Sequence, residues 1–202
     1  MWDQRYSEPG FVYGTEPNDF LAANAERYLP VKGKVLCLGE GEGRNAVFLA
    51  GRGFRVTGVD SSAVGLAKAR QLAGKQGVVI ETIVADLAEF ELGEARWHGI
   101  VSIWCHTPPE LRRRLHRAAV AALEPEGVVL LEAYTPKQLD YKTGGPPSAE
   151  LLMTLATLRE ELDGLEFLHA CETVREVHEG RYHKGPSAVV QVIARKPAIP
   201  TG

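Results

Sequence analysis

The stretch that decides the fold is VLCLGEGEGRNAVFLA, from Val35 to Ala50. An apolar run of strand length leads into a turn with Gly39, Gly41 and Gly43, and a helical pattern follows. A chain that turns from a strand into a helix needs backbone angles that residues with a Cβ rarely adopt, and bare backbone lets a ligand approach closely. The segment therefore predicts the first strand, turn and helix of a ligand-binding α/β sheet.

Apolar runs of strand length continue to alternate with helical patterns on the C-terminal side of this segment, as in successive βαβ units. Five strands are predicted, at 34–38, 55–59, 78–84, 99–104 and 127–132, with helices at 44–52, 63–75 and 109–123. A further helix is expected directly after Asn18, whose side chain suits an N-cap. A loop at 135–147, a helix at 149–162 and an antiparallel hairpin of 166–177 with 188–194 complete the chain. We predict a doubly wound, Rossmann-like seven-stranded sheet, mostly parallel, with helices on both faces.

The bulk composition is that of one globular domain spanning residues 1–202. Hydrophobic residues make up 45% of the chain and charged residues 24%, and no window reaches the roughly 18 uninterrupted apolar residues of a membrane span. The net charge of −3 argues against a nucleic-acid-binding surface. The three cysteines are far apart, which predicts neither a disulfide framework nor a CxxC metal site and fits a cytoplasmic protein. The basic run of Arg112, Arg113 and Arg114 is expected on a solvated helix face.

An acidic residue follows the second predicted strand, in FRVTGVD, which ends at Asp60. A carboxylate at this point can accept hydrogen bonds from two ribose hydroxyls. Dinucleotide-binding proteins share this arrangement, but their loop has the form G-x-G-x-x-G, and here Arg44 occupies the place of the last glycine. An NAD(P)-dependent oxidoreductase therefore stays as an alternative that Arg44 disfavours.

The loop instead has the form G-x-G-x-G, which resembles motif I of the class I S-adenosylmethionine-dependent methyltransferases. The resemblance implies S-adenosylmethionine as cofactor. Asp60 would bind the ribose beside Ser61 and Ser62, and IVADLAEF would place Asp86 and Leu87 at the adenine. The resemblance assigns the loop contacts to Gly39, Glu40, Gly41, Gly43, Arg44 and Asn45.

One position departs from that family. Many class I methyltransferases have an aspartate where this chain has Cys37, two residues before the first glycine. Glu40, Glu42 and Arg44 are the candidates to replace its contacts. Cys37 itself, inside a predicted central strand, is expected to be an inert buried thiol.

The opening segment carries a more specific likeness. WDQRY and YGTEPNDFL resemble the tellurite-resistance type of methyltransferase and its thiopurine-methylating relatives, and LEAYTPKQL and YHKGPSAVVQVIARKP extend the likeness over nearly the whole chain. This implies a cofactor-covering segment at 1–33, cofactor-binding units at 34–133 and acceptor-side elements at 134–195. Near the methionine part of the cofactor it would place Arg5, Tyr6, Tyr13 and Gly14. The alternative is that these aromatic residues form a small satellite core.

The methyl acceptor is expected beside the fourth strand, which ends in IVSIWCHTPP. His106 is the candidate general base, and the alternative is that it only fixes its loop. Trp104 is expected beside the adenine or the acceptor. Tyr134, also a candidate catalytic residue, and His183 are expected on the same rim, whereas His178 is expected in solvent.

A sulfonium methyl group is already activated, so a soft acceptor needs alignment and not a base. The family resemblance implies a small-molecule acceptor, such as a thiol or a chalcogen oxyanion. No nucleic acid, membrane or metal is expected as a partner, and the protein is expected to be a monomer or a homodimer. A second alternative is a regulatory module that binds the cofactor without turnover.

Overall fold

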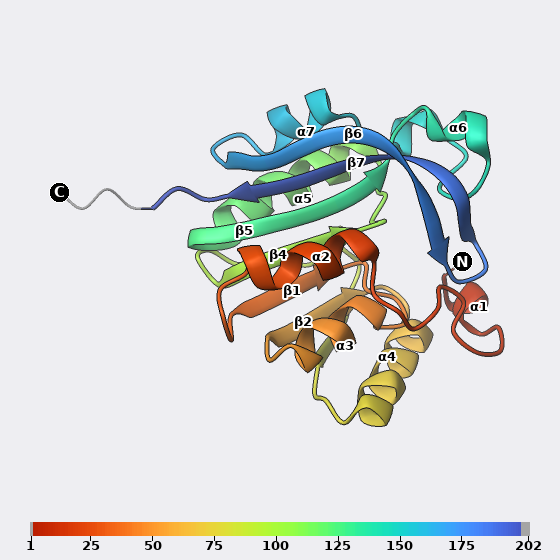
Figure 1. Cartoon of the computed structure of the whole chain (residues 1–202). Helices are drawn as coiled ribbons and strands as arrows, with labels where there is room; N and C mark the ends of the chain where they lie inside the picture. Colours follow the sequence, from red (N-terminus) through yellow and green to blue (C-terminus); the bar gives the residue numbers. More distant parts are fainter. Residues whose placement is uncertain (1, 199–202) are drawn as a thin grey trace.

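The predicted architecture is confirmed by the computed structural model of the protein, which describes residues 2–198 (Figure 1). Its sheet has seven strands in the order β3-β2-β1-β4-β5-β7-β6. The first five pair in parallel, and β7 pairs antiparallel with both of its neighbours, β5 and β6. Their bounds are β1 Lys34–Leu38, β2 Arg55–Asp60, β3 Glu81–Val84, β4 Trp97–Ile103, β5 Leu123–Tyr134, β6 Glu166–Glu179 and β7 His183–Arg195.

Helices cover both faces of the sheet, as predicted. α2 and α3 pack on one face together with α4, and α5 and α7 pack on the other (Figure 1). β1 shows why, because Val35 and Cys37 point into the first layer while Leu36 and Leu38 point into the second. The helices are α1 Trp2–Tyr6, α2 Asp19–Tyr28, α3 Arg44–Gly51, α4 Ala63–Gln76, α5 Pro109–Ala122, α6 Gln138–Tyr141 and α7 Leu155–Glu161.

The strand order reverses between β1 and β4, which are neighbours although two strands separate them in the chain. In an open parallel sheet, the crevice outside the strand ends at such a reversal is where ligands bind. The glycine turn follows β1 and the IWCHTPP segment follows β4, so the fold brings both to this crevice.

Several predicted boundaries were wrong. The predicted helix at 149–162 is a short 3₁₀ turn, Ala149–Leu151, followed by the separate helix α7. The break arises because Met153 donates its backbone N–H to the Tyr134 carbonyl, and the Thr154 side chain then caps α7. β6 and β7 extend beyond the predicted hairpin and are joined only by residues 180–182; their joined ends bend toward α1 (Figure 1).

Three side chains bear on the predictions about helix capping and solvent exposure. Asn18 caps α2 as expected, accepting the N–H of Leu21 at 3.0 Å. His178 is exposed, as expected. Arg112 is not solvated, because it is buried and holds the carboxylate of Glu161 with Nε and Nη2 at 3.1 Å. The first arginine of the basic run, Arg112, therefore forms a buried ion pair and does not lie on a solvated helix face.

Candidate cofactor and acceptor site

A cavity of about 1310 Å³ lies in the crevice at the strand reversal. Segments from the whole length of the chain contribute to its wall. The lining includes most of the predicted site residues: Arg5, Tyr6, Tyr13, Gly39, Glu40, Arg44, Asn45, Asp60, Ser61, Asp86, Leu87, Trp104 and His106. Gly14, Gly41, Gly43, Ser62 and Tyr134 are not part of the lining.

The three loop glycines differ in what they make room for. Gly39 lines the cavity at φ 62°, and a Cβ there would lie 3.0 Å from Sγ of Cys105. Gly43 packs against α4, where a Cβ would lie 2.5 Å from Cβ of Ala69. Gly41 is covered by the hydroxyl of Tyr6. Only the first glycine thus offers bare backbone directly to the cavity.

Asp60 fixes the glycine turn from the end of β2. Its Oδ2 accepts the N–H of Gly41 at 2.9 Å, and its Oδ1 accepts the N–H of Ser62 at 2.8 Å. Burial raises the pKa of Asp60, and these two N–H bonds oppose the rise. Each oxygen keeps acceptor capacity, so the carboxylate can also receive two hydroxyl donors.

Ser62 and Glu42 hold other parts of the structure in place. The Ser62 hydroxyl donates to Oδ1 of Asp3 at 2.5 Å and accepts the N–H of Gly65, so it joins α1 to the start of α4. Oε2 of Glu42 accepts the N–H groups of Val12 and Tyr13 at 2.6 and 3.1 Å. The segment before α2 is thereby fastened beside the glycine turn.

Glu40 lies on the cavity wall, directly after Gly39. Its Oε1 accepts the N–H of Ala46 at 2.8 Å, near the start of α3. Burial raises the pKa of Glu40 to about 7. Cys37 behind it is fully buried, and burial holds the pKa of its thiol well above the usual value, so the prediction of a buried, unreactive thiol agrees with the structure.

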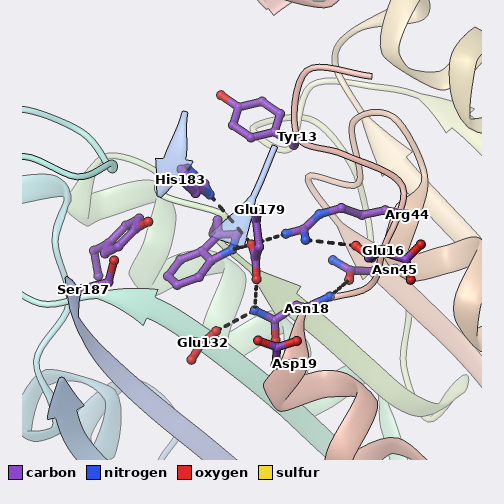
Figure 2. Close-up of polar contacts among 12 residues, drawn as sticks. Tyr13, Glu16, Asn18, Asp19, Arg44, Asn45, Glu132, Glu179, His183 and Ser187 are labelled. Carbon is purple, nitrogen blue, oxygen red and sulfur yellow. Dashed lines mark hydrogen bonds and ion pairs between the residues drawn. The ribbon is translucent and has the colours of Figure 1, made fainter. Parts of the chain in front are cut away.

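Glu179, at the end of β6, is the centre of a buried polar network that sequence patterns did not reveal (Figure 2). Its Oε2 accepts from Nη2 of Arg44 and from Nε1 of Trp104, both at 2.5 Å. Its Oε1 accepts from Nδ2 of Asn18 at 2.8 Å. Burial alone would raise the pKa of Glu179, but contacts with His183, Arg44 and Trp104 hold it well below the usual range. The carboxylate is therefore ionised.

The network continues away from the cavity. Nδ2 of Asn18 also donates to Oε2 of Glu132, which in turn accepts from Nη2 of Arg175 at 2.7 Å. Oδ1 of Asn45 accepts the backbone N–H of Asn18 at 2.9 Å. Arg44 and Asn45, expected from the glycine motif as cofactor contacts, thus also connect the glycine turn to β5 and β6.

Trp104 and His106 line the cavity after β4, and the buried ring of Tyr134 packs against both. Trp104 stacks on Tyr134 with 4.3 Å between ring centroids, and His106 stacks on Tyr134 at 5.7 Å. Tyr134 is fully buried beneath Gly144 and Gly145, so its ring supports the wall from behind.

His106 has both ring nitrogens engaged by backbone. Nδ1–H donates to the carbonyl of Trp104 at 3.1 Å, and Nε2 accepts the N–H of Tyr134 at 3.0 Å. Burial lowers the pKa of His106 to about 4. The geometry favours the alternative in which this histidine fixes its loop, because neither nitrogen is left to accept a proton from an acceptor.

Sequence comparison relates the segment that carries this site to a known kind of domain. Residues 35–127, which include the glycine turn and Asp60, match the family described as a methyltransferase domain. The matched segment runs from β1 through β4 and ends inside β5. No curated protein sequence matches the chain.

Solved structures share the fold of this chain over most of its length. A structure concerned with the conversion of a disulfide bond into a thioacetal group during echinomycin biosynthesis is 21% identical with a TM-score of 0.75, covering 96% of this chain and 87% of that one. An S-adenosylmethionine-dependent methyltransferase from Methanosarcina mazei is 19% identical with a TM-score of 0.69, covering 87% and 97%. TehB from Haemophilus influenzae is 22% identical with a TM-score of 0.70, covering 88% and 61%.

Neither a membrane-spanning helix nor a metal cluster is found in the part of the chain that the structure describes. Among the helices of residues 2–198, none has both the length and the apolar character needed to cross a membrane. Within the same residues, no group of three or more histidine, cysteine, aspartate or glutamate side chains is placed to hold a metal ion.

Proposed function

We propose that this chain is a methyltransferase that binds S-adenosylmethionine in the cavity and transfers its methyl group to a small soft acceptor, a thiol or a chalcogen oxyanion. The observation that carries the proposal is the position of Asp60. Its buried carboxylate fixes the glycine turn and still lines the cavity, at the place where a ribose would present two hydroxyls.

The cavity fits the cofactor in size and in the chemistry of its wall. Its volume of about 1310 Å³ exceeds that of ordinary small-molecule pockets and leaves space for an acceptor beside the cofactor. We assign the adenine to Asp86 and Leu87, the ribose to Asp60 and Ser61, and the methionine part to the side of Glu40 and Tyr13. Asp86 uses Oδ1 to accept the N–H of Ala88, which leaves Oδ2 available.

When bound, S-adenosylmethionine supplies a methyl group that its positively charged sulfur has already activated. The residues of the chain then have to orient the acceptor and exclude water. The ring of Trp104 provides an apolar surface for this purpose, and the buried ring of Tyr134 stacks against it. One structural neighbour is concerned with the conversion of a disulfide bond into a thioacetal group, and this sulfur chemistry fits a soft acceptor.

Titration calorimetry with S-adenosylhomocysteine and with NADH tests the cofactor. We expect the parent protein to bind the former and not the latter, which would exclude the oxidoreductase alternative. Asp60→Ala should weaken binding by about 10- to 100-fold, since hydrogen bonds to a charged group contribute about 1.5–3 kcal/mol. Asp163→Ala removes an exposed carboxylate elsewhere and should bind as the parent does.

The acceptor is tested with labelled methyl donor offered together with thiols, amines, hydroxyl compounds, selenite or tellurite. Transfer to a thiol or to a chalcogen oxyanion supports the proposal. Cofactor binding without transfer to any compound of the set would favour the regulatory module, and tight NADH binding would overturn the cofactor assignment.

A further inference from the structure

Two histidines line the cavity, His106 and His183. Within residues 2–198, the ring nitrogens of His106 are bonded to backbone groups, whereas those of His183 are not. His183 begins β7, directly after the turn that follows Glu179. Its ring lines the cavity but is only 8% exposed. Nδ1 is buried without a hydrogen-bond partner and lies 3.9 Å from Oε2 of Glu179 (Figure 2).

The ring is held between aromatic neighbours. Tyr13 lies 5.0 Å away between ring centroids, Trp104 meets the ring edge-on at 5.3 Å, and Tyr134 does so at 5.5 Å. Because Nδ1 faces Glu179 inside the protein, Nε2 on the opposite edge of the imidazole is the nitrogen left to the cavity side. The carboxylate of Glu179, 3.9 Å from Nδ1, favours the tautomer that carries the proton on Nδ1 and leaves the lone pair on Nε2.

We propose that His183 is the general base of the methyl transfer, oriented by Glu179, and that the acceptor is a thiol that enters the cavity with its proton. This inference rests on the proposed function and chooses between its two acceptor classes. A chalcogen oxyanion is already ionised and needs no base, whereas an alkyl thiol is mostly protonated at neutral pH.

The charges around His183 suit this role. Burial lowers the pKa of His183, the carboxylate of Glu179 opposes that effect, and the cations of Arg44 and Arg5 add to the lowering. The other titratable groups nearby are Tyr13, Tyr134, Tyr182 and His106. The ring is therefore neutral at neutral pH and able to accept a proton.

The step is balanced without a further reactant. The S–H bond of the acceptor breaks and its proton moves to Nε2 of His183. The sulfur electron pair forms the bond to the methyl carbon, while the carbon–sulfur bond to the donor breaks and its pair stays on the donor sulfur. The products are a methyl thioether and S-adenosylhomocysteine, and the imidazolium returns its proton to water at the cavity mouth.

The size of the effect follows from the ionisation of the acceptor. A free alkyl thiol with a pKa near 8.5 is only about 3% thiolate at pH 7. Without the base, transfer would depend on that fraction, so we expect His183→Gln to slow methylation of N-acetylcysteinamide by about 10- to 30-fold at pH 7. The loss should disappear by about pH 9.5, where the thiol ionises unaided.

Methylation of 4-nitrothiophenol provides an internal comparison for the same variant, because this aryl thiol is already ionised at neutral pH and needs no base. His183→Gln should leave its rate unchanged. His178→Gln, an exposed histidine on β6, is the matched control and should leave both rates unchanged. Calorimetry with S-adenosylhomocysteine shows that each variant keeps its cofactor site.

A readout independent of turnover is the ring-nitrogen NMR spectrum of the ligand-free protein. We expect His183 as the Nδ1–H tautomer. The Nε2–H tautomer, an equal loss on both thiols, or no loss on either would overturn the assignment. A parent protein that binds S-adenosylhomocysteine but methylates neither thiol would overturn the thiol acceptor alone, whereas absence of that binding would overturn the proposed function itself.

Discussion

Nη2 of Arg44 donates to Oε2 of Glu179 at 2.5 Å, across 135 positions of sequence, and both side chains are almost fully buried. Arg44 begins the helix behind the glycine turn, and Glu179 ends β6 next to the turn before His183. The pair therefore connects the glycine-turn side of the cavity to the side that carries His183. A change at either residue is expected to affect both.

The strength of this connection can be measured by substitution. Arg44→Met leaves the buried carboxylate of Glu179 without its main cation, and breaking such a pair costs about 3–5 kcal/mol. Urea unfolding should show a loss of that order. The control is Arg52→Met, which breaks an exposed pair with Glu26 and should cost less than about 1 kcal/mol. Equal losses in the two variants would contradict the central place of the network.

Gly43 should not tolerate a side chain. It has φ 91°, and an added Cβ would lie 2.5 Å from Cβ of Ala69 on α4. Strain and overpacking together predict that Gly43→Ala lowers the free energy of unfolding by about 2–4 kcal/mol. Gly51, the last residue of α3, has open space around its Cα, so Gly51→Ala should be neutral or stabilising by up to about 1 kcal/mol. A tolerated Gly43→Ala would argue against close packing of α3 on α4.

The raised pKa of Glu40 predicts that its contribution to the free energy of unfolding falls as the pH rises. Its folded-state pKa of about 7 lies above the ordinary value of 4.5, so folding favours the protonated form. The corresponding stability is fully present below about pH 4.5 and is lost as the pH rises through 7. Glu40→Gln should therefore resemble the parent at pH 5 and be more stable at pH 8 in urea unfolding. A constant difference between parent and variant at the two pH values would show that Glu40 does not titrate in this range.

His106 should titrate far below an ordinary histidine. Its pKa of about 4 in the folded protein lies under the usual 6.5 because its ring is buried. The unfolded chain binds the proton first, so this residue costs stability as the pH falls from about 6.5 toward 4. Histidine NMR should show a neutral ring with Nδ1–H down to about pH 5. A titration near pH 6.5 would restore His106 as a candidate base.

Local pattern was enough for the sheet and for one end of the site. The unbroken apolar run along Val35–Leu38 marks a strand buried on both faces, and closely spaced glycines mark the turn after it. Asp60 was found because it ends the next strand, and parallel strands end at one edge of the sheet. These features depend on neighbours in sequence, so residue type and spacing reveal them.

The pairing of two buried charged residues depended on tertiary structure. Arg112 belongs to a basic run and Glu179 lies between the exposed residues His178 and Gly180, yet each is buried against a partner far away in the chain. Whether a charged residue is solvated or paired depends on strand order and helix packing. Composition near the residue carries no such information.

The glycine turn, the acid after β2 and the alternation of strands and helices are thus properties of short segments, set by backbone sterics and burial. The assignment of the proposed base to His183 and not to His106 depends instead on tertiary structure. His106 lies just after the fourth predicted strand and His183 in the turn of the predicted hairpin. Only the folded chain places backbone partners on both nitrogens of the His106 ring and a carboxylate 3.9 Å from Nδ1 of His183.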